Sequence, residues 1–404
     1  MFATRTEQQP MQSNAAGLGY FGPFDGIRGI GMIMVLLAHL SYASFSSFAV
    51  AVDMFFVISG FLITTLLLEE HDRSARIDMG NFFWRRAFRL FPMLYATLIA
   101  TVLGAWASGH RDLLDRAVND AASAAFYVYH VVHPVGIEIE TSRFPEHRPL
   151  IQLWSLSVEE HFYLIAAFMT LFVVRRNLAK PLIGLFLGGW AFIAVARLTG
   201  HVGPRFAWYQ RPDSLMIGTA LAYVHALLPA QLSESGQRAL RAAGAVAVAV
   251  LGITILVGTK LVPYRLQRQF SPYDGTSRLT DDWYWGRFGF SIANLCLGIL
   301  VLTMVRNRDW IVNRFLSLRG FRAIGVRSYC LYLLHVPLAV VLFETFAEIN
   351  PDTGDFAPSA GLAGGYLVAL VVLTEVCHRF IEQPMIAYGK RFVKRRRTRS
   401  TATA

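Results

Sequence analysis

Charged side chains are scarce in this sequence. Asp, Glu, Lys and Arg make up 16% of its 404 residues, whereas hydrophobic residues make up 54%. A soluble domain carries about 25% charged residues, so this composition excludes an ordinary water-soluble globule. Basic residues exceed acidic ones, 38 to 27, and they cluster beside apolar segments. That placement indicates membrane topology and argues against nucleic acid as a partner.

Cysteine is also rare, and signals for secretion or internal duplication are missing. The three cysteines, Cys296, Cys330 and Cys377, fall inside apolar segments. We interpret them as core residues, and neither a disulfide framework nor a metal site is predicted. Residues 1–19 are polar and lack a signal peptide, so a disordered cytoplasmic N-terminus is expected. The lack of an evident repeat disfavours a transporter built from inverted repeats.

Ten apolar runs approach the length of about 20 residues that a membrane-spanning helix needs. They are residues 27–44, 50–68, 90–107, 154–174, 181–198, 206–228, 239–258, 286–305, 321–346 and 361–380. An eleventh run, 117–132, is shorter and begins with polar residues, so we predict that it does not cross. The sequence therefore predicts an all-α polytopic membrane protein with about ten transmembrane helices.

Basic residues orient this arrangement. With the N-terminus inside, five basic segments face the cytoplasm, as the positive-inside rule requires. They are residues 71–89, 175–180, 238–241, 306–322 and 390–399. Both termini are then cytoplasmic, and residues 108–153 and 259–285 are external segments long enough to fold over a mouth. We expect a transmembrane domain at 20–388 and a basic tail at 389–404, which either contacts anionic lipid or is a disordered, solvated end.

Polar side chains interrupt the first apolar run at Asp25, Arg28 and His39. At about 100° per residue, Arg28 and His39 share a helix face, and Asp25 lies roughly 40° away. Burying such groups in a bilayer costs about 2.5–3.5 kcal/mol or more each, which predicts a polar site inside the protein. Asp53 lies at the start of the next predicted helix. With the N-terminus inside, both His39 and Asp53 are near the external side, where the Asp53 carboxylate is able to orient the His39 imidazole. Alternatively, Asp53 caps its helix and His39 bonds a backbone carbonyl.

Three arginines, Arg85, Arg86 and Arg89, occupy one cytoplasmic helix entrance in the segment FFWRRAFRLFP. Guanidinium groups bind phosphate oxygens through two parallel hydrogen bonds, so this cluster is a candidate phosphate site. The competing interpretation is a positive-inside anchor beside an aromatic belt.

A further polar group begins a span at its external side, in WSLSVEEHFY. Trp154, Ser157, Glu159 and Glu160 there suit a sugar-like polyol, although acidic residues at a helix start also interact favourably with the helix dipole. Ser328, Tyr332 and His335, spaced at i, i+4 and i+7, form a polar stripe that joins helices or belongs to the same site. Arg379 and Glu382 are expected to close the last helix at its cytoplasmic end, as an end cap or an interhelical ion pair.

Six motifs follow one another over nearly the whole chain: FDGIRG followed by AHL, VDMFFVISGFLIT, RRAFRLFP, LWSLSVEEHFYL, RSYCLYLLHVP and RFIEQP. In this order the sequence resembles the membrane-bound acyltransferase-3 family, whose members O-acylate glycans, glycolipids and macrolides. The resemblance implies an acyl-CoA donor, usually acetyl-CoA, reached from the cytoplasm. It implies His39 as the catalytic histidine and Arg28, Arg86 and Arg89 as functional arginines, and Asp53 falls in the matching aspartate-bearing segment.

The chain departs from the family pattern in two places. Phe24 stands where leucine or arginine-bearing variants are common, and no hydrolase-like domain follows residue 404. From the second departure we expect transfer to finish within the membrane domain.

These observations favour an O-acyltransferase of the bacterial inner membrane that acetylates a cell-envelope glycolipid or polysaccharide. His39 is the expected general base, because a sugar hydroxyl needs one to attack a thioester. Arg28, Arg85, Arg86 and Arg89 are expected to bind the donor. The expected acceptor-binding residues are Asp25, Trp154, Ser157, Glu159, Glu160, Tyr332 and His335. A macrolide acceptor is an alternative, and the rival class is a proton-coupled transporter that uses His39, Asp53 and His335 as relay groups.

Overall fold

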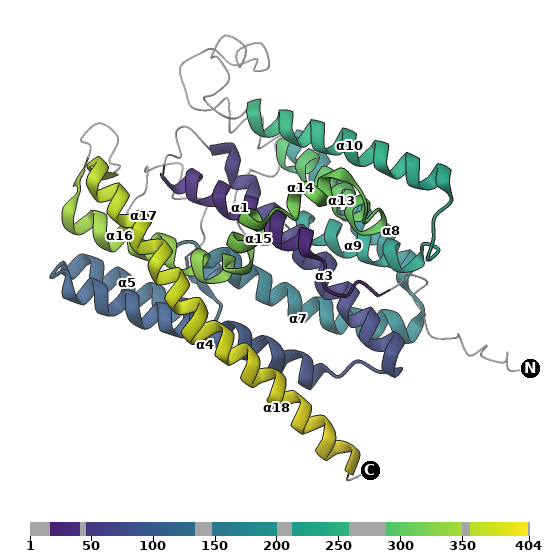
Figure 1. Cartoon of the computed structure of the whole chain (residues 1–404), viewed down its shortest axis with the longest axis horizontal. Coiled ribbons are helices and arrows are strands. Elements are labelled where there is room, and N and C mark those ends of the chain that lie inside the picture. Colours follow the sequence, from purple (N-terminus) through teal and green to yellow (C-terminus); the bar gives the residue numbers. More distant parts are fainter. Residues whose placement is uncertain are drawn as a thin grey trace, which may run out of the picture. The chain divides into compact units, whose positions relative to one another are not determined.

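The computed structural model describes residues 17–40, 46–133, 148–199, 212–257, 288–349 and 356–402. Most of these residues are helical, and the strands among them form one short antiparallel ribbon, β1 (Glu348–Ile349) with β2 (Phe356–Ala357) (Figure 1). The chain divides into two compact units. The first unit comprises Met1–Ile77 and His161–Gly325, and the second comprises Asp78–Glu160 and Val326–Ala404.

Helix α3 is at the centre of the first unit, where it packs against α1, α9 and α13. Helix α9 also packs against α8 and α13, and α10 packs against α13. The elements of this unit are α1 (Gly22–Leu40), η1 (Ser46–Val50), α3 (Ala51–Ser74), the larger part of α7 (Leu153–Arg176), α8 (Ala179–Leu198), α9 (Asp213–Leu227), α10 (Glu234–Val257), α13 (Phe290–Arg306), α14 (Ile311–Leu316) and α15 (Arg319–Val326).

Two glycines let the backbones of α3 and α9 touch. A Cβ atom built on Gly218 would lie 2.2 Å from the carbonyl oxygen of Val57, and one built on Gly60 would lie 2.6 Å from that of Leu215. Real Cβ atoms do not approach backbone this closely, and the backbone of a helix cannot rotate away as a side chain can. Helices in membranes commonly associate through small residues of this kind.

We predict that alanine has opposite effects at two glycines of this unit. Gly218→Ala should destabilise the protein by about 1–3 kcal/mol or more, because its methyl group overlaps the Val57 carbonyl. In Gly188→Ala, on α8, the new methyl group has no atom within 4 Å. This substitution should be neutral or stabilise the protein by up to about 1 kcal/mol, because alanine has the higher helix propensity. Thermal unfolding of the purified variants checks this, and equal midpoints for the two would contradict the close crossing.

Helix α4 organises the second unit, where it packs against α5, α16, η3 and α18. Its contact with α18 is aromatic: Phe392 lies 5.3 Å, centroid to centroid, from both Trp84 and Phe88. The elements of this unit are α4 (Met79–Ala107), α5 (Arg111–Ala125), α6 (Tyr129–Val132), the start of α7, α16 (Ser328–Phe346), β1, β2, α17 (Ala360–Cys377), η3 (His378–Glu382) and α18 (Gln383–Ala402).

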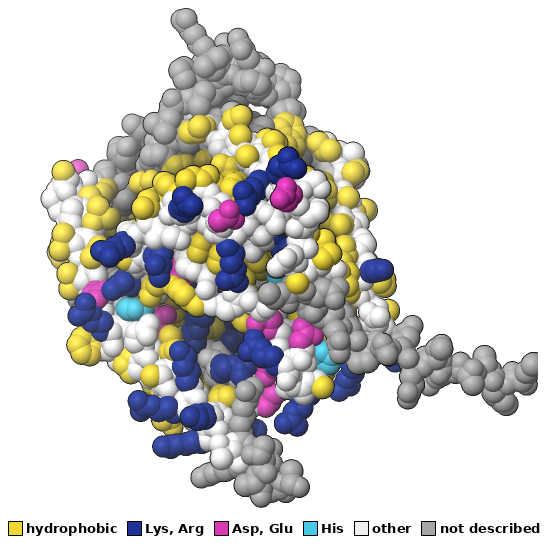
Figure 2. Space-filling model, turned by 45° about the vertical axis from the view of Figure 1, so that its right-hand side comes forward, with side chains coloured by type: hydrophobic (Ala, Val, Ile, Leu, Met, Phe, Trp, Pro, Cys, Tyr) yellow, Lys and Arg dark blue, Asp and Glu magenta, His cyan; other side chains and the backbone are white. Residues whose placement is uncertain are grey.

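The described helices are those of a multi-pass membrane protein. Seven of them are long and apolar enough to cross a bilayer, and α13 is a shorter apolar helix. Hydrophobic side chains lie exposed on the molecular surface, with Lys and Arg spread between them on the face shown in Figure 2. Such faces are stable against lipid, and Phe192 on α8 and Val371 on α17 are 74% and 64% exposed.

Each of the ten predicted runs overlaps a described helix, but their boundaries differ, most clearly in two runs. The run 321–346 is broken at Arg327, between α15 and α16, where the guanidinium bonds the Glu375 carboxylate. The run 361–380 does not end near Glu382, because α17, η3 and α18 continue as one helix. The run 117–132 is divided between α5 and α6 and includes no candidate span. The number of crossings and the side of the termini stay predictions.

The predicted basic tail is helical where the structure describes it, through Ala402. Its first turn packs on the protein, since Val393 is buried and Phe392 contacts α4. The predicted domain boundary at residue 388 therefore falls inside α18. Residues 1–16 of the predicted disordered segment 1–19 lie outside the described residues, as do the whole predicted external segment 259–285 and residues 134–147 of the other one. Leu18, within the predicted disordered segment, is buried and its carbonyl accepts from Arg308.

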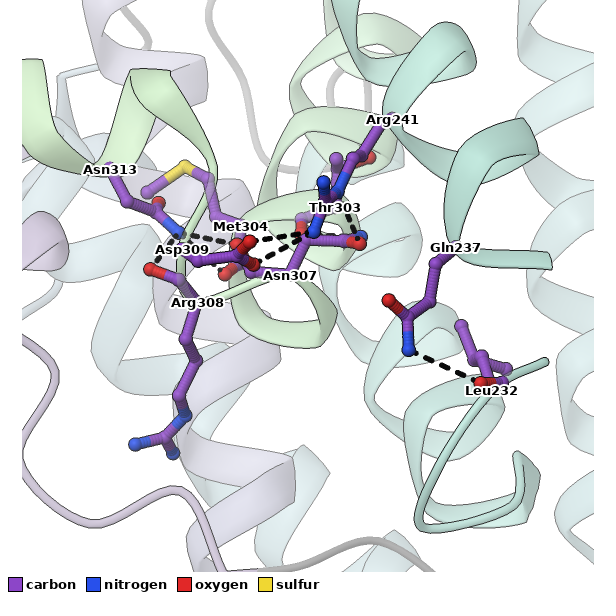
Figure 3. A network of polar contacts seen from close by, with 9 residues as sticks. All are labelled: Leu232, Gln237, Arg241, Thr303, Met304, Asn307, Arg308, Asp309 and Asn313. Carbon is purple, nitrogen blue, oxygen red and sulfur yellow. Dashed lines mark hydrogen bonds and ion pairs between the residues drawn. The ribbon is translucent and has the colours of Figure 1, made fainter. Parts of the chain in front are cut away.

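A polar network joins α10 to the turn after α13 (Figure 3). Arg241 donates to Asn307 Oδ1 at 3.0 Å and to both Asp309 carboxylate oxygens, while Asn313 Nδ2 donates to the carbonyl oxygens of Met304 and Asn307. Arg308 points away from this network and donates to the Leu18 carbonyl. The predicted basic segments 238–241 and 306–322 therefore meet, as segments on one side of a membrane can.

Candidate functional site

The geometry of His39 fixes which of its ring nitrogens can act as a base. His39 lies near the C-terminal end of α1, where its Nδ1 is 2.9 Å from the carbonyl oxygen of Val35. A carbonyl oxygen only accepts, so Nδ1 carries the proton and Nε2 keeps the lone pair. The residue is exposed at the surface of the helix. The alternative that His39 bonds a backbone carbonyl is confirmed, and it is compatible with catalysis because it selects the tautomer.

Asp53 is fully buried in the first turn of α3, the helix against which α1 packs. The N-cap of α3 is Val50, whose side chain makes no capping hydrogen bond. The alternative that Asp53 caps its helix from the first turn stays a prediction. Contact between Asp53 and His39 stays a prediction.

Asp25 and Arg28 lie at the other end of α1. Asp25 and His39 are fourteen positions apart, which is about 21 Å of helix, so the predicted polar stripe is not a single site. Tyr20 donates its hydroxyl to Asp25 Oδ2 at 2.5 Å and accepts from Arg322 Nη2 at 3.0 Å. Asp25 is thus part of a polar chain at the start of α1, and Arg28 is half-buried one turn further along.

In the second unit, the structure joins two predicted clusters that the sequence had kept apart. Arg86 of α4 forms an ion pair with Glu160 of α7, in which Nη2 pairs with Oε1 and Nε lies 3.3 Å from Oε2. Arg89 is exposed but close enough for its charge to act on Glu160, and Arg85 is half-buried. The prediction that Arg86 marks a cytoplasmic entrance and Glu160 an external mouth is therefore wrong for this pair.

The buried start of α7 explains that error. Leu150, Gln152 and Leu153 are all at most 2% exposed, so α7 begins inside the unit rather than at an external surface. The segment before it is held by Asp120, which accepts from Arg148 Nη1 at 2.6 Å and from the Leu150 amide at 3.3 Å. Burial raises the pKa of the Asp120 carboxyl, and the Arg148 charge opposes that rise.

Tyr127 lies beside the Arg86–Glu160 pair with an unusual backbone. Its φ of +56° is in the left-handed region that costs energy for a residue with a side chain. Burial raises the pKa of its hydroxyl, and the Glu160 carboxylate raises it further while Arg86 opposes the rise. Among the described residues its hydroxyl has no hydrogen-bond partner. The sequence reasoning missed this residue, because nothing in its local pattern marks a tyrosine that follows α5.

The predicted polar stripe on α16 reaches the start of α7. The Tyr332 hydroxyl donates to the Gln152 carbonyl at 2.7 Å, and its oxygen lies 2.6 Å from Ser155 Oγ. His335 is fully buried, with Nδ1 2.7 Å from the Tyr332 carbonyl oxygen. Ser157 bonds back to the Leu153 carbonyl of its own helix. Trp154 is buried, and Glu159 is half-buried next to Glu160.

The sequence reasoning also missed a buried network in the first unit. Arg197 of α8 is fully buried and binds both carboxylate oxygens of Asp213 in α9, at 2.7 and 3.1 Å. Ser291 and Asn294 of α13 complete it, since Arg197 donates to Ser291 Oγ and Asn294 donates to Asp213. The signal was available: a charge inside each of two predicted spans suggests a partner in the other.

Comparison with known proteins adds the family. A sequence model of the acyltransferase domain (acyltransferase-3) matches residues 23–375 of this chain. That range contains every residue predicted for the candidate site.

Curated relatives match along most of this chain. The peptidoglycan O-acetyltransferase OatA of Listeria monocytogenes is 27% identical over 92% of the chain and 56% of its own length. The putative peptidoglycan O-acetyltransferase YrhL of Bacillus subtilis is 28% identical over 86% of the chain and 52% of its own length. The O-acetyltransferase OatA of Staphylococcus aureus is 28% identical over 84% of the chain and 53% of its own length. The chain therefore spans about half the length of these relatives, and no solved structure matches it.

Proposed function

Because the chain belongs to the acyltransferase-3 family, we propose that it is an integral-membrane O-acyltransferase that moves an acyl group, most simply acetyl, from acyl-CoA to a hydroxyl of a cell-envelope glycan. The names of the relatives, which refer to peptidoglycan, support a glycan acceptor over a macrolide. Family membership also favours an enzyme over a proton-coupled transporter. The observation that carries the mechanism is the bond from His39 Nδ1 to the Val35 carbonyl, which leaves Nε2 as the base.

The proposed reaction needs one base and one leaving group. His39 Nε2 takes the proton of the acceptor hydroxyl as its oxygen attacks the thioester carbonyl carbon. The tetrahedral adduct then collapses, the carbon–sulfur bond breaks, and the CoA thiolate leaves with the proton returned by the imidazolium. The products are the acyl ester and free CoA. Asp53 would act as a positioning residue that orients the imidazole.

The donor site is proposed at the arginines of α4. Arg86 and Arg89 are one turn apart on the same face and present guanidinium groups that suit CoA phosphates, with Arg85 and Arg28 as further donor-binding residues. In the structure, the Arg86 guanidinium is already paired with the Glu160 carboxylate. A phosphate would therefore have to compete with the Glu160 carboxylate for Arg86.

This competition predicts opposite effects of two substitutions on acyl-CoA affinity. Arg86→Ala should weaken binding by about tenfold or more, because a hydrogen bond to a charged group contributes about 1.5–3 kcal/mol. Glu160→Gln should strengthen it, because the amide competes less well for the guanidinium. Calorimetric titration of the purified variants measures both. Arg175→Ala, an exposed arginine of α7, is the control and should leave affinity unchanged. Weaker binding in both Arg86→Ala and Glu160→Gln would contradict competition.

The acceptor side is proposed from residues around the start of α7 and α16. Trp154, Ser157, Glu159, Glu160, Tyr332 and His335 are the proposed acceptor-binding residues there, and Asp25 is the proposed one in the first unit. The location proposed is the bacterial inner membrane with both termini cytoplasmic, and the basic part of α18 is proposed to contact anionic lipid.

Transfer of radiolabel from acetyl-CoA tests the function directly. Membranes that contain the protein are given labelled acetyl-CoA, and the lipid, polysaccharide and peptidoglycan fractions are counted. Label in a glycan fraction, absent without the protein, is the expected result. Label in no fraction, with folded protein and several acyl-CoA donors, would contradict the proposal.

A further inference from the structure

Three metal-binding side chains that the proposed reaction does not use converge in the second unit. Cys330 of α16, His378 and Glu382 are all buried, and their ligand atoms lie within 4.8 Å of one another. The same carboxylate oxygen, Glu382 Oε2, accepts from Cys330 Sγ at 3.2 Å and faces His378 Nδ1 at 2.6 Å. Sulfur, nitrogen and oxygen atoms therefore surround one small volume.

The helix geometry accounts for this convergence. His378 and Glu382 bound the π-helical turn η3, which joins α17 to α18. A π turn is a local widening that often marks a functional site. Here it directs the ring and the carboxylate of one helix toward the thiol of another. Helices α4 and α18 also pack against η3.

We propose that Cys330, His378 and Glu382 form a binding site for a divalent transition metal ion, most simply Zn²⁺. Thiolate, imidazole and carboxylate are the three side-chain ligands that zinc uses in proteins. Bond lengths of about 2.0–2.3 Å place the ligand atoms of a tetrahedral site roughly 3.3–3.8 Å apart. The distance of 2.6 Å between His378 Nδ1 and Glu382 Oε2 reaches that range when the two side chains separate by about 1 Å, and the 3.2 Å between Cys330 Sγ and Glu382 Oε2 is already close to it.

Charge balance favours the ion. A thiolate and a carboxylate carry two negative charges, which one divalent cation neutralises in a buried place where net charge is costly. On binding, the thiol proton of Cys330 leaves to solvent, and the neutral imidazole of His378 keeps its single proton on the other ring nitrogen. A water molecule or a further donor would fill the fourth position.

A neighbouring amide supports the required ring orientation. Gln383 Nε2 lies 3.3 Å from His378 Nε2, on the side of the ring opposite Glu382. When the metal occupies Nδ1, the ring proton moves to Nε2, and the amide accepts it after a half-turn about its own axis. Metal-bound histidines are commonly held by such a bond to the other nitrogen. This site departs from the sequence-based expectation of no metal site, in which Cys330 was interpreted as a core residue.

Cobalt substitution tests the site without relying on enzyme activity. The purified full-length protein is titrated with Co²⁺, which shows a charge-transfer absorption when bound by thiolate. We expect one equivalent to bind with this band, and Zn²⁺ to displace it. Cys330→Ser should abolish the band, and His378→Ala should weaken Zn²⁺ binding by roughly 100-fold or more. Size-exclusion chromatography confirms that each variant is folded.

Two other cysteines serve as controls. Cys296→Ser, in α13 of the first unit, should keep the band, and so should Cys377→Ser, which removes the thiol next to His378 along the chain. Loss of the band in Cys377→Ser with retention in Cys330→Ser would overturn the assignment. So would a folded wild-type protein that shows no thiolate band and retains no zinc.

Discussion

Replacing His39 with alanine is expected to lower acyl transfer by at least about 100-fold while leaving the protein folded. A positioned general base contributes roughly 10²–10⁴-fold to a rate. His39 is exposed by surface area on α1, and its Nδ1 bonds to a carbonyl of its own helix. The measurement is the initial rate of label transfer from acetyl-CoA, at equal amounts of protein.

An exposed histidine provides the matched control. His110→Ala, just before α5, removes the same group from another exposed position and should keep full activity. Thermal unfolding should show the same midpoint for both variants. A His39→Ala variant with wild-type rates would rule out His39 as the base and leave the proposed mechanism without one.

Removing Arg197 is expected to destabilise the protein by about 3–5 kcal/mol. Its guanidinium is fully buried and holds both oxygens of the Asp213 carboxylate, so Arg197→Leu strands a buried negative charge. The double variant Arg197→Leu with Asp213→Leu should recover much of that loss, because it removes the unpaired charge as well. Denaturation of the purified variants gives the differences in unfolding free energy.

The matched comparison is an ion pair in the same unit whose arginine is exposed. Arg73 pairs with Glu69 one turn earlier on α3, and the Arg73 side chain is 73% exposed whereas that of Glu69 is 11% exposed. Arg73→Leu should change stability by less than about 1 kcal/mol, as for most exposed ion pairs. If Arg197→Leu and Arg73→Leu lower the unfolding free energy by the same amount, the buried pair contributes no more to stability than the pair at the surface.

The sequence was a good guide to where helices lie, because apolar runs of membrane length have few alternatives to helix. It was a poor guide to where they begin. The run predicted at 90–107 is part of α4, which starts at Met79, where the Asp78 carboxylate caps it by accepting from the Asn81 amide. Charged residues between 79 and 90 hid that start, since the partner of Arg86, Glu160, lies on a distant segment.

Site residues were easier to identify than their partners. Motif positions selected His39, Arg86 and Glu160, but no spacing along one chain states that Arg86 and Glu160 face each other. The role of Gly60 and Gly218 in the close helix crossing was not predicted, for a similar reason. The absence of a side chain becomes informative only when the opposing backbone is known to lie within contact distance.

The unbroken helix from α17 through η3 to α18 is longer than a membrane is thick. Its 37 residues from Ala360 to Arg396 extend about 55 Å, whereas the hydrocarbon core measures about 30 Å. Where this helix spans a bilayer, one end projects well beyond the lipid tails. A tilt of that end, for example when its basic residues meet a more strongly charged lipid surface, is transmitted along the same helix to the π turn at His378–Glu382. The composition of the surrounding lipid is thereby linked to the spacing of the side chains on that turn.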